Sequence, residues 1–105
     1  MQVSQNVIDT LNNVCSNNNV TAGNIKKMRE YGRSLPLIRG IDEKSKENNK
    51  VVYFISDIVS FMELQLRKPA VRRLKISECL DRINNISAIM AEQGCISYEH
   101  EVIEG

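Results

Sequence analysis

The sequence of 105 residues contains no tryptophan, and aromatic residues make up only 5% of it. So few aromatic rings make a base-stacking platform for single-stranded nucleic acid a poor expectation. No apolar run approaches the roughly 20 residues that a membrane-spanning helix requires, and no signal-peptide pattern is present. We therefore expect a cytoplasmic protein without membrane contact.

Sequence patterns for catalysis and metal binding are also scarce. The three cysteines include no C-x-x-C pair, which favours reduced, buried thiols over a disulfide framework or a zinc site. The one histidine, His100, lies in an acidic C-terminal segment without a nucleophile motif. Glycine-rich phosphate loops, H-E-x-x-H motifs and paired-carboxylate arrangements are absent from the sequence. We expect neither an enzyme nor a bound cofactor or metal.

The net charge of +1 conceals a segregation of charge along the chain. Residues 20–40 hold five basic residues and one acidic residue, and residues 67–75 hold five basic residues and no acidic one. Residues 76–105 reverse the sign, with one basic and six acidic residues. A polyanion would thus meet two basic patches. The alternative interpretation is that each charge run is simply a solvent-exposed face without a partner.

The first segments of the chain predict two short helices joined by a turn. Apolar residues at helical spacing from Val7 to Cys15 predict a first helix, with Ser4 as its N-cap. The Asn-rich run 16–19 predicts the turn. A second helix is expected from Thr21, its N-cap, to about Tyr31. Its apolar and basic positions point to opposite sides: Ile25 and Met28 on one, Lys26 and Lys27 on the other.

The next segment predicts a β-hairpin. Gly32 is expected to end the second helix, and Pro36 favours an extended segment over residues 35–39. A polar loop follows over residues 40–50, and the β-branched and aromatic run 51–54 predicts a strand. Two strands around a charged loop, beside a helix-turn-helix, form a wing.

The C-terminal half predicts two further helices. Ser56 or Asp57 is expected to cap the first, and Pro69 to break the chain after it. A second helix over residues 70–93 carries an apolar seam that must pack on the domain or on a second copy of the chain. We expect it to form a homodimer interface through Ile76, Cys79, Leu80, Ile83, Ile86 and Met90. The predicted units are therefore a domain at 1–68, a self-associating helix at 69–93 and an acidic tail at 94–105.

Three segments of the chain resemble a known family. Val20-Thr21-x-x-Asn24-Ile25-Lys26-Lys27-Met28 resembles the V-[ST]-x-x-T-[VIL]-x-[RK]-[LM] core of winged helix-turn-helix domains. These domains occur in phage excisionases, Cox and AlpA-type phage regulators, pyocin activators and MerR-type regulators. Gly32 with Leu35-Pro36-Leu37-Ile38-Arg39 is similar to the G-x-LP-x-x-R that follows it there, and residues 51–61 are similar to the strand closing the wing and the S-D-[IV]-x-x-F helix start.

The resemblance implies a mainly α winged helix-turn-helix fold, with a two-stranded hairpin wing and an appended C-terminal helix. It also implies a duplex-DNA-binding regulator, either of transcription or of recombination directionality. Thr21 would meet a phosphate, positions in the second helix would face the major groove, and Arg39 with the wing lysines would touch the DNA backbone or minor groove. The candidate DNA-contacting residues are Thr21, Ala22, Gly23, Asn24, Lys26, Lys27, Arg29, Arg39, Lys44, Lys46 and Lys50.

Two other functions remain open from the sequence. The same fold could serve as an adaptor or inhibitor that binds a host protein through its helical seam and acidic tail, because function resides in sites and not in folds. A DNA-packaging or replication accessory protein would share the domain as well. A continuous positive surface from Lys26 and Lys27 to Arg39 would favour DNA, whereas neutralisation by neighbouring acidic residues would favour a protein partner.

Overall fold

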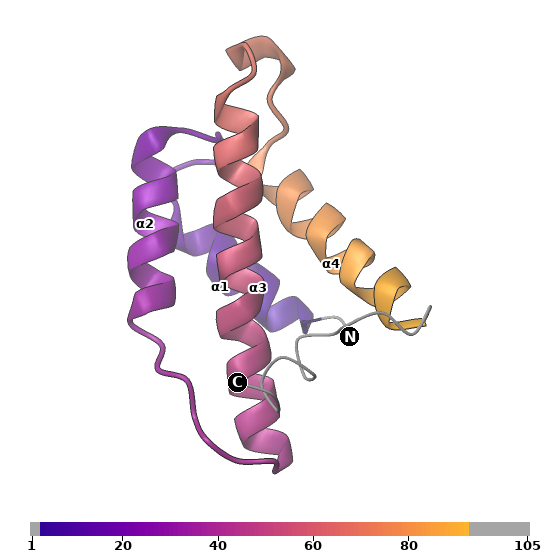
Figure 1. Ribbon diagram of the computed structural model, residues 1–105. Helices are drawn as coiled ribbons and strands as arrows, with labels where there is room; N and C mark the ends of the chain where they lie inside the picture. The colour runs from indigo at the N-terminus through magenta and orange to yellow at the C-terminus, as the bar shows by residue number, and fades with distance from the viewer. Residues whose placement is uncertain (1–2, 93–105) are drawn as a thin grey trace.

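The computed structural model of the protein describes residues 3–92, with side chains as far as Ile86. Four helices, α1 (Gln5–Val14), α2 (Ala22–Arg33), α3 (Glu43–Leu66) and α4 (Ile76–Glu92), follow one another in the chain (Figure 1). A single 3₁₀ turn, η1 (Ala70–Arg72), lies between α3 and α4, and residues 3–92 contain no β-strand. The prediction of a mainly α protein is therefore confirmed.

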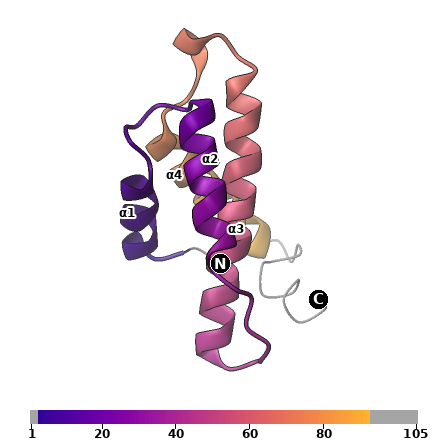
Figure 2. The same ribbon diagram turned by 90° about the vertical axis from the view of Figure 1, so that its left-hand side faces the viewer.

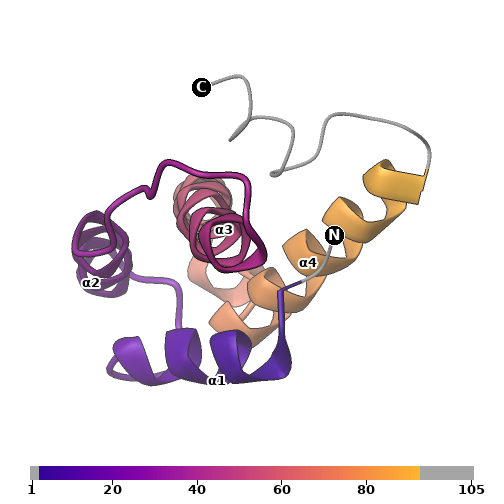
Figure 3. The ribbon, with the colours of Figure 1, turned by 90° about the horizontal axis from the view of Figure 1, so that it is seen from below.

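The long helix α3 is the centre of the bundle. It packs against α2 on one side and α4 on the other, while α1 contacts both α2 and α4. Figure 3 shows α2 and α3 almost end-on, with α1 running across them. The 34–42 connection continues past the end of α2, and α3 then runs back alongside it, so α2 and α3 are antiparallel (Figure 1).

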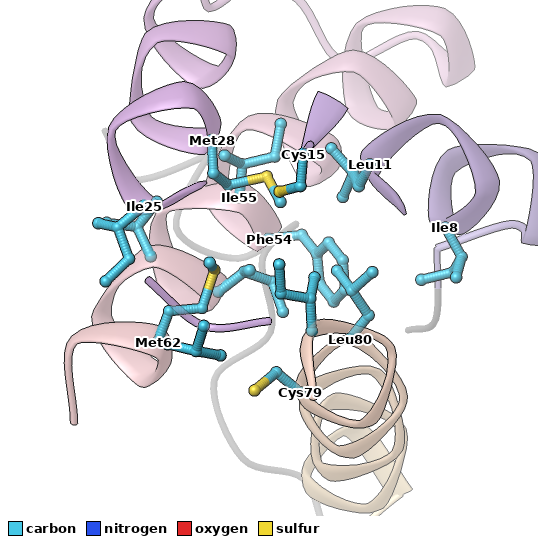
Figure 4. Packing of buried hydrophobic residues seen from close by; sticks show 14 of the residues in the cluster. Ile8, Leu11, Cys15, Ile25, Met28, Phe54, Ile55, Met62, Cys79 and Leu80 are labelled. Atoms are coloured by element: carbon cyan, nitrogen blue, oxygen red, sulfur yellow. The ribbon is translucent and has the colours of Figure 1, made fainter. Parts of the chain in front are cut away.

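All four helices contribute to one apolar core. Phe54 of α3 projects toward Leu80 of α4, and Leu11 of α1 and Met28 of α2 lie close by (Figure 4). These four side chains are fully buried. Burying a large apolar side chain stabilises the fold by about 1.5–3 kcal/mol.

The two N-terminal helices begin where the sequence predicts. The Ser4 hydroxyl accepts a hydrogen bond from the Val7 N–H, and the Thr21 hydroxyl accepts one from the Asn24 N–H at 3.1 Å. The prediction that Gly32 ends the second helix is wrong, because α2 continues to Arg33. Gly32 instead lies inside α2, at its close approach to α3.

The predicted wing is wrong for this structure. Residues 43–66 form one helix. Its N-cap is Asp42, whose carboxylate accepts a hydrogen bond from the Ser45 N–H at 2.9 Å. The run 51–54 has the composition of a strand, but its apolar residues continue a helical repeat through Ile58 and Met62. Burial of that stripe in the core outweighs β-propensity, which depends strongly on context. Ser56 and Asp57, the predicted helix caps, consequently lie exposed in the middle of α3.

The C-terminal helix also differs from its prediction. It begins at Ile76 and not at residue 70, and the chain before it forms η1. Ile76, Cys79 and Leu80, predicted to bind a second copy, are buried in the core of the same chain because α3 and α1 supply the apolar surface.

The rest of the seam divides at the edge of the core. Ile83 is half-buried against the core, and Ile86 is 42% exposed. Met90 and the acidic tail at 94–105 lie outside the described side chains. None of the helices within residues 3–92 combines the length and apolar character needed to cross a bilayer.

Candidate nucleic-acid interface

Asn24 organises the turn that leads into α2. Its side chain is 3% exposed. The amide oxygen accepts a hydrogen bond from the Ser16 N–H at 3.0 Å, and the amide nitrogen donates to the Asn17 side chain at 3.0 Å and to the Asn19 carbonyl at 2.8 Å. With these bonds made and the residue buried, Asn24 positions the turn and is not an exposed DNA contact, contrary to the prediction.

The same turn caps helix α4, which lies far away in the sequence. The Asn18 carbonyl accepts a hydrogen bond from the Ile76 N–H at 3.0 Å, and its side-chain oxygen accepts one from the Ser77 N–H at 2.8 Å. Unpaired N–H groups at a helix start need such acceptors. The neighbouring Lys75 ammonium donates to the Asn19 side chain at 2.8 Å. These bonds bring Lys75, the last residue of the second basic segment (67–75), beside the turn that leads into α2.

The outward face of α2 is the basic surface that its sequence predicts. Ile25 and Met28 are buried, whereas Lys26 and Lys27 are exposed on the other side. The Lys27 ammonium donates to the Ser16 hydroxyl, which holds it beside the turn. Thr21, Ala22 and Gly23 are exposed at the start of the helix.

Two acidic residues, Glu63 and Glu30, reduce the positive charge of this face. The Arg29 guanidinium is paired with Glu63 of α3, so Arg29 is partly neutralised. Glu30 is exposed on α2. Arg33, which the predicted contact set omits, is also exposed and adds a positive charge to this face. Arg33 lies seven residues after Lys26, a spacing that puts both on one side of a helix. That spacing could have identified Arg33 from the sequence.

The remaining predicted contacts lie at the other end of α2. Arg39 and Lys44 are exposed and Lys46 is half-buried, all in or next to the connection from α2 to α3. The 12 residues of α2 span roughly 18 Å, so these residues lie well away from the entry to α2 at Thr21. Lys50, predicted to contact DNA, is 3% exposed and donates to Glu47 at 2.7 Å, so its ammonium is not available for that contact.

The charge at that second end is mixed. Three acidic residues lie within the same few turns: Asp42, Glu43 and Glu47. Hydrogen bonds from the Ser45 backbone N–H and hydroxyl lower the pKa of Asp42 below its ordinary value, so this carboxylate is charged at neutral pH. The net basic surface is therefore at the α2 entry and not at the predicted wing.

No protein-family model, no curated protein and no solved structure matches this chain. The resemblance to winged helix-turn-helix domains is therefore still a prediction, and the hairpin that would define the wing is not present in residues 3–92. What the geometry provides is a capped, exposed basic helix, and a second basic segment held near its start.

Proposed function

We propose that this protein is a sequence-specific duplex-DNA-binding regulator that contacts DNA with the outward face of α2. The observation that carries the proposal is the exposure of Lys26 and Lys27 on a helix whose opposite side is fixed in the core. Lysine side chains and helix N-termini suit phosphate oxygens, and lysine also hydrogen-bonds to guanine in the major groove. A regulator of transcription and an excisionase-like recombination factor of phage or mobile-element type are both consistent with this surface.

The position of α2 supports access to DNA. It lies at the edge of the bundle, and none of the described helices covers the side that faces away from α3 (Figures 2 and 3). The major groove of B-DNA is about 12 Å wide and admits an α-helix. The Thr21 cap and the Asn24 network hold the first turn of α2 in a defined orientation, which a reading helix needs.

One recognition helix offers few contacts, so we propose that two copies bind paired half-sites. Within the described side chains, Ile86 is the exposed position of the α4 seam that remains for contact between copies. Light scattering at micromolar concentration tests this proposal. A dimer that becomes a folded monomer with Ile86→Glu would support it, and a monomeric wild type would contradict it.

The test of DNA binding is fluorescence anisotropy on duplexes from the upstream region of the protein's own gene, across a salt series. We expect site-selective binding that weakens steeply with salt, because bound lysines release counterions from DNA. Lys26→Ala/Lys27→Ala should remove the selectivity. Lys44→Ala/Lys46→Ala removes the same charge at the other end of α2 and serves as the matched control.

A contrary result would be equal binding to all duplexes by the wild type, or selective binding that the Lys26→Ala/Lys27→Ala variant retains. Thermal melts of both double variants show whether the fold is intact. Because three of the four lysines are exposed and Lys46 is only half-buried, we expect the melting temperatures of both double variants to stay close to that of the wild type.

The second candidate function is an adaptor or inhibitor that binds a host protein. One observation favours it: the connection between α2 and α3 exposes apolar residues, with Leu37 at 55% and Ile41 at 77%. Neighbouring exposed apolar side chains are a common feature of protein-binding surfaces. If Leu37→Ser/Ile41→Ser abolishes capture of a cellular partner while DNA binding is absent in the wild type, this function replaces the first.

A further inference from the structure

The chain between α3 and α4 forms a basic projection. Residues 67–75 extend beyond the end of the bundle at which α2 begins (Figures 1 and 2). At its tip Val71 is 94% exposed, so solvent surrounds the 3₁₀ turn η1. The segment holds no acidic residue and five basic ones, namely Arg67, Lys68, Arg72, Arg73 and Lys75.

This projection is held by hydrogen bonds at its base. The Arg73 guanidinium donates to the Lys68 carbonyl at 2.9 Å and to the Leu66 carbonyl at 3.1 Å. The buried side chain of Gln65 accepts a hydrogen bond from the Leu74 N–H at 3.1 Å. On the α4 side, Asn18 binds the residues that follow Lys75. A segment that is already ordered loses less conformational entropy when it binds a partner.

The outward cations of the projection are available. Arg67, Lys68 and Arg72 are exposed, and within residues 3–92 no hydrogen bond or ion pair engages their charged groups. Cations at the C-terminus of a helix stabilise its dipole, which accounts for the first two but not for Arg72. Folding therefore uses the charged groups of Arg73 and Lys75 and leaves those of Arg67, Lys68 and Arg72 in solvent.

We propose that residues 67–75 bind the phosphate backbone of the duplex that α2 reads, so that this loop has the role that the sequence predicts for a hairpin wing. The inference rests on the proposed DNA binding by α2. Its physical basis is the hydrogen-bonded contact between the α1–α2 turn and the start of α4, which sets the loop and the α2 entry at one end of the molecule. Phosphate contacts add affinity without sequence preference.

The experiment compares the full chain with Lys68→Gln/Arg72→Gln by fluorescence anisotropy on specific and unrelated duplexes, from 50 to 300 mM salt. Loss of two phosphate contacts should reduce the magnitude of the negative slope of log K against log salt by about two. It should also weaken binding at 0.1 M salt by at least roughly tenfold on every sequence. The charge-conserving variant Lys68→Arg/Arg72→Lys should keep the wild-type slope. Lys44→Gln/Lys46→Gln, which removes equal charge at the far end, should keep it too.

Each outcome separates the two proposals. Suppose that the wild type binds DNA, and that Lys68→Gln/Arg72→Gln melts like the wild type and has the same salt slope. That result overturns the role of the loop and leaves α2 as the reading helix. A wild type that binds no duplex overturns both. If the charge-conserving variant loses as much affinity as the neutral one, the effect comes from structure and not charge, which also overturns the phosphate contact.

Discussion

A β-carbon on Gly32 would lie 2.8 Å from Cγ2 of Ile55, so α2 and α3 approach too closely at this point for a larger residue. Ile55 is 2% exposed, and its β-branched side chain has few rotamers with which to move aside. The glycine is therefore required by packing between helices. This relationship explains why the chain keeps a poor helix former inside α2 and sets the distance between the basic helix and the centre of the bundle.

Gly32→Ala should destabilise the protein even though alanine is the better helix former. Overpacking costs about 1–3 kcal/mol, against a propensity gain of about 1 kcal/mol, so we expect a net loss in the free energy of unfolding. Gly23→Ala is the matched control, because its β-carbon would meet only the Thr21 hydroxyl at 3.9 Å. It should be neutral or stabilise the protein by up to about 1 kcal/mol. Urea denaturation measures both, and a stabilising Gly32→Ala would refute the close contact.

Asn18→Ala should lower stability by removing the cap that α4 receives from the α1–α2 turn. The loss of an Asn cap costs about 1 kcal/mol, which corresponds to a fall in melting temperature of about 4–8 °C for a domain of this size. Asn13→Ala, an exposed change on α1, should stay within about 0.5 kcal/mol of the wild type. Equal melting temperatures for the two variants would mean that Asn18 does not hold α4.

Acid should weaken the start of α3 through Asp42. The Ser45 backbone N–H, and then its hydroxyl, lower the pKa of Asp42 in the folded protein. The resulting stabilisation is present above the unfolded pKa of about 3.9 and is lost as pH falls through the lower folded value. Asp42→Asn keeps a cap but cannot titrate. Its melting temperature relative to the wild type should rise below pH 4; a difference that is constant from pH 7 to pH 2 would contradict this.

The buried thiols of Cys15 and Cys79 should react slowly in the native protein. Burial, and next the negative charge of Glu78, raise the pKa of Cys79 to about 11, and burial also raises the pKa of Cys15. Because the thiolate is the nucleophile, Cys79 should react with a disulfide reagent at pH 8 on the order of a hundredfold more slowly than in denaturant. Cys95→Ser removes the third thiol from the measurement. Rapid native labelling of two thiols in that variant would show that the core is open.

The sequence by itself determined the local features of the N-terminal half. Ser4 and Thr21 cap the helices that follow them, and the apolar spacing of Ile25 and Met28 directs the two lysines outward. These features depend on interactions within one or two helical turns, so neighbouring residues suffice to predict them.

Only the tertiary structure decided the rest. The run 51–54 is helical because its apolar stripe is buried in the core between α2 and α4. Ile76, Cys79 and Leu80 of the α4 seam are in the core because α3 and α1 offer them a surface. The meeting of the two basic segments depends on Asn18, which is 59 residues from its partner Ser77. Such contacts join parts of the chain whose proximity no local pattern encodes, because the burial that stabilises them exists only when all four helices have packed.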